Sequence, residues 1–184
     1  MLWFIWVLIG AVLLIGLAFF VYYNRFAILG NRIDNSLSQI NVQLKRRAEL
    51  IPNLISTVKG FAAHEKAAIK SVTDARTKLI NAEGLDAKMK ADKGLESALK
   101  SIFALAEAYP DLKANTNFLE LQRELAATED KVAYSRQYYN DSIMSYNDLC
   151  KTFPGVIFAG IFGKKPEDYL QITEAEKKNV EVKF

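Results

Sequence analysis

Few side chains in this sequence could carry out chemistry. Its 184 residues include one histidine, His64, and one cysteine, Cys150. His64 and Glu65 belong to the stretch HEKAA, which lacks the second histidine, four residues on, that a helical zinc site requires. Because zinc and related metals are held mainly by imidazole and thiolate ligands, the sequence predicts no metal site.

Two serines each precede a lysine by three residues, a spacing that places a nucleophile beside an amine on a helix. The matches are STVK at Ser56 and SALK at Ser97, and neither has the SDN or KTG motif of penicillin-recognising enzymes. The sequence also lacks the GxGxxG, GxxxxGK[ST] and GxSxG motifs of nucleotide sites and hydrolases. We therefore expect no catalytic residue and no cofactor.

Glu65 is the polar residue with the most unusual predicted position. It lies between Phe61 and Ala68 on the apolar stripe of a predicted helix, where a carboxylate requires a partner because its desolvation is costly. Equal helix spacing places it level with Thr128 and near Asn35. We predict that these residues form a buried polar layer that fixes the helix register, and the alternative is a functional role for Glu65.

The elements that position these residues begin with an apolar segment. No charged residue occurs in the range 2–23, and about 20 apolar helical residues match the ~30 Å hydrocarbon thickness of a bilayer. The sequence begins without the basic residues of a signal peptide, which predicts a retained transmembrane helix. Its marker residues are the interfacial aromatics and the small residues of the span: Leu2, Trp3, Trp6, Gly10, Gly16, Tyr22 and Tyr23.

Charge begins after this span. Arg25 is the first basic residue, and others follow it closely, which predicts a cytoplasmic C-terminal part and an N-terminus outside the cell membrane. A single cysteine fits a reducing compartment. The net charge of +3 comes from interspersed acids and bases without a recognition motif, so we expect no nucleic-acid partner.

The rest of the chain has the apolar periodicity of helices. We predict four of them: the first continues the span and ends at Pro52, the second follows to about Gly84, the third covers 95–109, and the fourth, capped by Asn117, runs to Thr152. In this arrangement the cations of LKRR (44–47) lie in the last turn of the first helix and interact favourably with the negative end of its dipole. The alternative is that they bind a partner.

Four amphipathic helices joined by short turns indicate an all-α protein. The predicted fold is an N-terminal transmembrane helix that continues into an antiparallel, up-down four-helix bundle with long helices. We divide the chain into an anchor (1–23), a helical-bundle domain (24–152), and an apolar membrane-proximal segment with a polar tail (153–184).

The apolar segment FPGVIFAGIFG (153–163) is too short to cross a membrane as a helix. In an up-down bundle the fourth helix returns toward the bilayer, so the segment is predicted to contact the membrane or a protein beside it. The alternative is that it caps the open end of the bundle. The candidate contact residues are Phe153, Val156, Ile157, Phe158, Ile161 and Phe162, with Phe158, Ile161 and Phe162 expected to be the deepest.

Two long stretches resemble a known family. NRIDNSLSQINVQLKRRAELIPNLISTVKGFAAHE (31–65) and LAEAYPDLKANTNFLELQRELAATEDKVAYSRQYYND (105–141) are similar to the hallmark blocks of the LemA family of bacterial membrane proteins. The resemblance continues through the following YN and FPG and implies one N-terminal membrane helix and a helical-bundle domain. It implies no activity, and the extension 164–184 is longer than is usual in the family.

From these features we predict a membrane-anchored helical scaffold that is not an enzyme. Its expected partners are membrane lipid, further copies of itself and an unknown protein partner. The alternative function is an adaptor subunit of a specific membrane enzyme or transporter.

Overall fold

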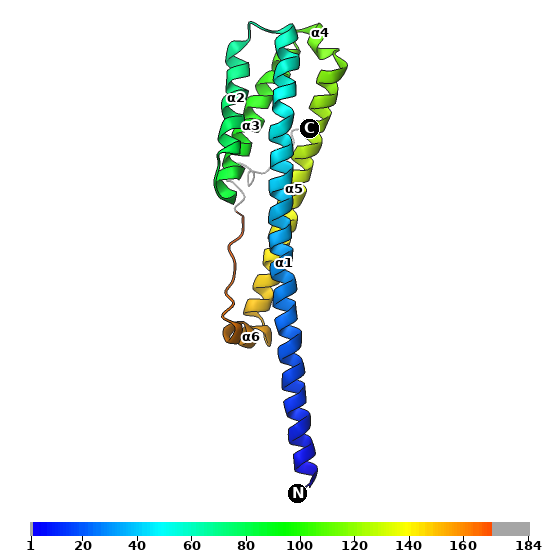
Figure 1. Cartoon of the computed structure of the whole chain (residues 1–184), viewed down its shortest axis with the longest axis vertical. Coiled ribbons are helices and arrows are strands. Elements are labelled where there is room, and N and C mark those ends of the chain that lie inside the picture. Colours follow the sequence, from blue (N-terminus) through cyan, green and yellow to red (C-terminus); the bar gives the residue numbers. More distant parts are fainter. Residues whose placement is uncertain (1, 171–184) are drawn as a thin grey trace, which may run out of the picture. The chain divides into compact units, whose positions relative to one another are not determined.

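The computed structural model describes residues 2–170, and its regular structure is helical throughout that range (Figure 1). The helices are α1 (Leu2–Phe61), α2 (Lys66–Ile80), α3 (Leu85–Ala106), α4 (Pro110–Lys113), α5 (Thr116–Lys151) and α6 (Gly155–Phe162). The prediction of an all-α protein with a long apolar N-terminal helix is confirmed.

The chain divides into two compact units. The first contains α1 up to Ser38 together with residues 137–169, which include the end of α5 and all of α6. Among the described residues, the second contains 39–136 and Leu170. The predicted division places boundaries at residue 23, where the membrane span is expected to end, and at residue 152, where the helical bundle is expected to end. The two compact units do not follow these boundaries.

The first predicted turn is wrong, because Pro52 lies inside α1. Proline has no N–H to donate to the carbonyl four residues earlier, here that of Ala48. The structure satisfies this carbonyl from α2, where Arg76 Nε donates to the Ala48 oxygen at 2.9 Å. A long-range donor therefore replaces the missing helical hydrogen bond, and α1 continues to Phe61.

The turn between the first two helices follows Phe61. Ala62 is buried there, and the Glu65 N–H donates to its carbonyl at 3.1 Å. α2 ends at Ile80 with Asn81 as its C-cap, shortly before the predicted stop at Gly84. Gly84 instead directly precedes α3, with a φ of +79° that favours glycine. However, α3 begins at Leu85, before the predicted start at residue 95, so the mainly polar stretch 85–94 is also helical.

Two further helix ends differ from prediction. α3 ends at Ala106, before the predicted end at residue 109, and Pro110 is the first residue of the short helix α4. The cap of α5 is Asn115, whose Oδ1 accepts the N–H of Phe118 at 3.0 Å, and the predicted cap, Asn117, lies inside the helix. The change in cap shifts the helix start by only a fraction of a turn.

The core of the second unit follows the predicted stripes closely. Figure 1 shows α2 and α3 side by side. The buried apolar residues from α1, α2, α3, α4 and α5 are Ile40, Leu44, Ile51, Leu54, Val58, Ile69, Val72, Leu79, Leu95, Leu99, Ile102, Leu112, Phe118, Leu125 and Val132. Phe61, predicted to lie on this stripe, is instead exposed, because α1 ends there.

Candidate functional site

The residues considered for chemistry are placed apart from one another. His64 is exposed in the turn between α1 and α2. Ser56 and Ser97 are exposed, and Lys100 Nζ donates to Glu96 Oε1 at 2.6 Å in place of its neighbouring serine. Within the described part of the chain, no three His, Cys, Asp or Glu side chains gather in a way that could hold a metal ion.

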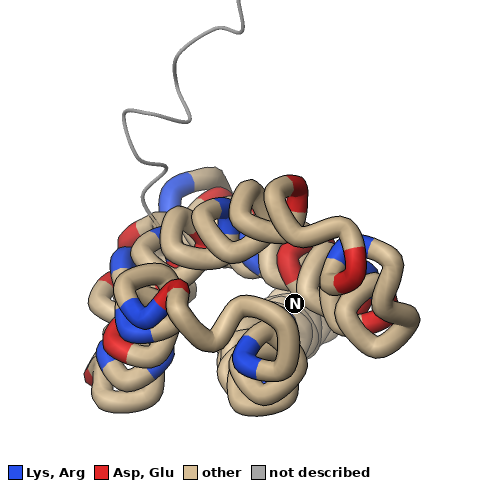
Figure 2. The backbone as a smooth tube through the Cα atoms, turned by 90° about the horizontal axis from the view of Figure 1, so that it is seen from above, with Lys and Arg blue, Asp and Glu red and all other residues tan. Residues whose placement is uncertain are grey.

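Acidic and basic residues are also mixed along the helices. Figure 2 shows both signs interspersed, without a long run of one sign on any helix. A nucleic-acid interface requires clustered positive charge. The mixed charges therefore do not indicate such an interface, and the candidate binding surfaces are the apolar ones.

The largest exposed apolar surface belongs to the start of α1. In the range 3–23 every residue is exposed or half-buried, and Trp3 and Trp6 are 71% and 72% exposed. Within residues 2–170, α1 is the one helix long and apolar enough to cross a membrane. An added Cβ at Gly10 or Gly16 would meet nothing within 4 Å. Leu2 begins the helix, and its side chain lies outside the described part.

At the end of this span, α6 docks against α1 through aromatic rings. Phe158 stacks on Tyr22 with ring centroids 4.5 Å apart, and Phe162 meets Phe19 edge-on at 4.8 Å. Phe162 also meets Tyr23 at 5.5 Å. Such pairs add stabilisation beyond the area they bury, so α6 has a specific seat on the last turns of the charge-free run.

The contacts also define the direction of α6. Phe158 and Phe162 are one helical turn apart, yet both rings contact Phe19, at 6.3 Å and 4.8 Å. A helix running alongside α1 would place its successive turns at different levels of α1. We therefore infer that α6 runs at an angle to α1, and Figure 1 draws the axis of α6 across the direction of α1.

The opposite face of α6 is apolar and exposed. Val156, Ile157 and Ile161 are 45%, 52% and 58% exposed, and Phe153, just before the helix, is 81% exposed. Phe158 and Phe162 are half-buried against α1. The structure thus separates the predicted contact residues into a docking set and an outward set, and Ile161 belongs to the outward set.

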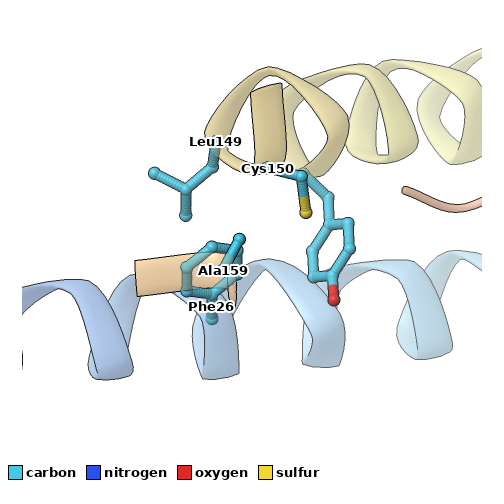
Figure 3. Close-up of a cluster of buried hydrophobic side chains, with 5 residues drawn as sticks. Phe26, Leu149, Cys150 and Ala159 are labelled. Carbon is cyan, nitrogen blue, oxygen red and sulfur yellow. The ribbon is translucent and has the colours of Figure 1, made fainter. Parts of the chain in front are cut away.

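Behind α6 lies a small core shared with α1 and α5. Figure 3 shows Leu149 and Cys150 extending from α5 toward Phe26 of α1, with Ala159 of α6 beside them. Burial raises the pKa of the Cys150 thiol, and the charge of Glu167 acts in the same direction. The thiol is therefore held in its neutral form and serves as a packing group.

Glycine allows the close approach of α6 to α5. A Cβ added to Gly155 would lie 2.2 Å from the carbonyl oxygen of Leu149, far inside van der Waals contact. By contrast, an added Cβ at Gly160 would meet nothing within 4 Å. The seat of α6 thus depends on a missing side chain at its first residue.

The segment after α6 is fastened back to α5. The buried side chain of Asn147 donates from Nδ2 to the Glu167 carbonyl at 2.8 Å, and its Oδ1 accepts the Glu167 N–H at 2.8 Å. A paired amide of this kind fixes the backbone in both directions. Asn147 thus fixes the position of the chain that follows α6. The close packing of Gly155 against Leu149 fixes the start of α6.

The second unit contains a buried ion cluster centred on Arg47. This side chain is 2% exposed, and its guanidinium donates to Asp92 at 3.0 Å and to Glu129 at 3.1 Å. Burial raises the pKa of Asp92, and the charge and hydrogen bonding of Arg47 oppose that rise. Arg47 is therefore a core residue that joins α1, α3 and α5, and its predicted role at a helix end is wrong.

Glu65 has a different partner from those expected. Its Oε1 accepts a hydrogen bond from the Tyr109 hydroxyl at 3.0 Å, and this bond raises the pKa of Tyr109. Thr128 is buried and donates to the Leu125 carbonyl of its own helix at 2.7 Å, whereas Asn35 is exposed. Because the turn lies later than predicted, Glu65 precedes α2 and does not form a layer with these residues.

Sequence reasoning missed Arg47, although a signal was present. Ile40, Leu44, Arg47 and Ile51 recur at steps of three and four residues, so the arginine lies on the apolar stripe itself. An interruption of such a stripe by a charged residue predicts a buried partner. The partners, Asp92 and Glu129, could not be chosen from spacing alone.

Comparison with known proteins now adds to this geometry. Residues 36–184 match the model of the LemA family. Protein LemA of Metamycoplasma hominis is 30% identical over 149 residues, which cover 77% of this chain and 67% of the relative. Magnetosome proteins MamQ 1 and MamQ 2 of Paramagnetospirillum magneticum are 26% identical over 175 residues, which cover 81% of this chain.

The chain spans 64% of the length of these two magnetosome proteins. The match of the family model extends from within α1 to the end of the sequence and so includes α5, α6 and the ion cluster. The chain belongs to the LemA family.

Proposed function

We propose that this protein is a single-pass, membrane-anchored helical scaffold without catalytic activity, which forms homo-oligomers and organises partners or the bilayer at the membrane face. The observation that carries the proposal is the exposure of residues 3–23, which are uncharged and unburied. Exposure of an apolar surface of this size to water is unfavourable, whereas the hydrocarbon core of a bilayer can bury it.

The second unit supplies the scaffold. We propose that α2 and α3 pack with the later part of α1 and the earlier part of α5 as an up-down four-helix bundle. Supporting contacts include Arg47 to Asp92 and Glu129, Arg76 to the Ala48 carbonyl, and the edge-on pair of Phe103 with Phe118. Such contacts between helices favour a rigid structural unit.

An exposed tyrosine on α5 supports self-association. Tyr138 lies in the part of α5 that belongs to the first unit, and it is 39% exposed. Tyrosine is enriched at protein interfaces because it offers a large apolar ring and a polar hydroxyl together. We propose that this face of α5 contacts the same face of a second copy.

Cysteine crosslinking in native membranes tests this proposal. The Tyr138→Cys variant, in a Cys150→Ala background, should form a covalent dimer on mild oxidation. Ala133→Cys is the matched control, because residue 133 is exposed on the same helix but on a different face, and it should crosslink much less. Equal yields from the two variants, or monomer alone, would contradict the proposed interface.

The same membranes distinguish the adaptor alternative. A scaffold should give a crosslinked species with twice the mass of the chain, whereas an adaptor should give a stoichiometric adduct with one different protein. We also propose an outside N-terminus and a cytoplasmic C-terminal part in the inner membrane, based on the position of the first cations. A C-terminal reporter that functions only outside the cytoplasm would contradict this orientation.

A further inference from the structure

Cations flank α6 at both ends. Lys151 is the last residue of α5, and Lys164 and Lys165 follow the left-handed Gly163 that ends α6. All three lysines are exposed, and none forms an ion pair within the part of the chain that the structure describes. Cations therefore lie just before the start and just after the end of α6, and the charges of Lys151 and Lys164 both act to lower the pKa of the Cys150 thiol behind it.

The apolar face of α6 lies at the level where the charge-free run of α1 ends. Its docking partners, Phe19 and Tyr22, belong to the last turns of that run, and Arg25 follows them exposed. If α1 crosses the bilayer here, this level is the boundary between acyl chains and headgroups. A helix that crosses α1 at this boundary lies in the plane of the membrane.

We infer that α6 is an in-plane interfacial helix that binds anionic phospholipid. Its outward residues, Val156, Ile157 and Ile161, enter the acyl region, and the ammonium groups of Lys151 and Lys164 bind lipid phosphates. This inference rests on the proposed membrane anchor and adds a lipid class to it. The bilayer is the favoured occupant because the exposed face continues the apolar surface of the span and is bordered by exposed cations.

The physical basis is the combination of two weak interactions. A short apolar face gives shallow insertion, and basic residues at the same surface add electrostatic attraction to anionic lipid. Long lysine side chains can extend from the apolar boundary to the phosphates. Each lysine near an anionic membrane surface is expected to strengthen the binding of this segment to that surface about fivefold.

Fluorescence quenching of the full-length protein in vesicles tests the inference. A bimane label at Ile157→Cys, in a Cys150→Ala background, reports contact with phosphatidylcholine or phosphatidylglycerol that carries a shallow doxyl quencher. We expect quenching by both lipids, and several times more by the anionic lipid at equal mole fraction. Ile161→Cys serves as a second reporter in case one label disturbs α6.

Two further labels and one charge variant separate the outcomes. Asp148→Cys, exposed on α5, should be quenched weakly, and Leu13→Cys, within the span, should be quenched by deep quenchers. The variant Lys151→Gln/Lys164→Gln/Lys165→Gln should remove the preference for anionic lipid while Leu13 remains quenched.

Each contrary result has a distinct meaning. Quenching at Leu13 without quenching at Ile157 or Ile161 would overturn the in-plane placement of α6 and leave the anchor standing. Loss of quenching at Leu13 as well would overturn the anchor and the inference together. Equal quenching by the two lipids, unchanged in the glutamine variant, would overturn the anionic-lipid site.

Discussion

The ring of Tyr22 on α1 stacks on the ring of Phe158 on α6, with centroids 4.5 Å apart and planes 6° from parallel. The sequence assigned Tyr22 to an interfacial aromatic belt and Phe158 to a deep membrane contact. The structure pairs them instead, so part of the apolar surface of each segment is used for docking the other. What remains exposed on α6 is a narrower, aliphatic face.

The close approach of Gly155 to Leu149 predicts that Gly155→Ala displaces α6. The added methyl group would overlap the Leu149 carbonyl, and overpacking of this kind usually costs about 1–3 kcal/mol. Crosslinking of Phe19→Cys with Phe162→Cys by a short bismaleimide, in a Cys150→Ala background, measures the docking. We expect the yield to fall several-fold in the Gly155→Ala variant.

Gly160→Ala is the control, because it adds the same methyl group to the same helix at an exposed position with open space around it. It should leave the crosslinking yield unchanged, and alanine should favour the helix slightly. An equal loss of yield in both variants would show that the contact between residue 155 and Leu149 does not determine the docking.

Arg47→Met should strongly destabilise the second unit. The substitution leaves the Asp92 carboxylate buried without its cation, and removal of one partner of a buried pair costs about 3–5 kcal/mol. Thermal unfolding of the full chain in detergent micelles, followed by helical circular dichroism, measures the loss.

The double variant Arg47→Met/Asp92→Leu is the companion measurement. It removes both buried charges, and apolar replacement of a whole buried pair is often neutral or stabilising. Glu129 is half exposed and remains solvated. A double variant as unstable as Arg47→Met alone would indicate that packing around residue 47, and not the unpaired carboxylate, causes the loss.

The raised pKa of Asp92 predicts a pH dependence of opposite sign to that of most carboxylates. Its folded-state pKa lies above the ordinary value of 3.8 because burial outweighs the attraction of Arg47. Protonation of Asp92 therefore contributes stability that is fully present below pH 3.8 and is lost as the pH rises through the folded-state value.

Comparison with Asp92→Asn isolates this effect. As the pH is lowered from neutral toward 3.8, the free energy of unfolding of the natural chain should rise relative to that of the variant. A relative decrease would mean that the attraction of Arg47 dominates over burial. Because the two chains differ at one titrating group, other carboxylates cancel in the difference.

Pattern reasoning predicted helix type and core better than it predicted helix ends. Leu44, Leu95 and Leu125 lie in the core as their spacing indicated, because one buried stripe repeats along each helix. Proline removes one helical hydrogen bond and so locally predicts a helix end at Pro52, but this prediction is wrong because α1 continues through it. The compensating donor, Arg76, lies on another helix and is invisible to local rules.

The same limit applies to the candidate site. Composition alone identified 153–163 as an unusual apolar segment and 2–23 as a membrane span. The assignment of Phe158 and Phe162 to docking, and of Ile161 to the outward face, required the partner helix, because all three are apolar and close in sequence. For similar reasons the sequence could not choose Tyr109 as the partner of Glu65.

The hydrogen bond from Arg76 to Ala48 predicts a thermodynamic coupling with Pro52. Arg76→Met leaves the buried Ala48 carbonyl without a donor, at a cost of about 1–3 kcal/mol. In a Pro52→Ala background, the new N–H at residue 52 can donate to that carbonyl, so the same substitution should cost less. Equal costs in the two backgrounds, measured by thermal unfolding, would show that the arginine acts independently of the proline.

The most direct test of the account is a cysteine accessibility scan of the full-length protein in native membranes, with a membrane-impermeant thiol reagent and a Cys150→Ala background. The central claim is that the start of α1 and the outward face of α6 lie in one bilayer. Cysteines at Leu13, Ile157 and Ile161 should stay unreactive in intact and opened membranes, whereas one at Lys165 should react once the membranes are opened. Rapid reaction at Ile157 and Ile161 from the aqueous side, with Leu13 protected, would contradict the claim.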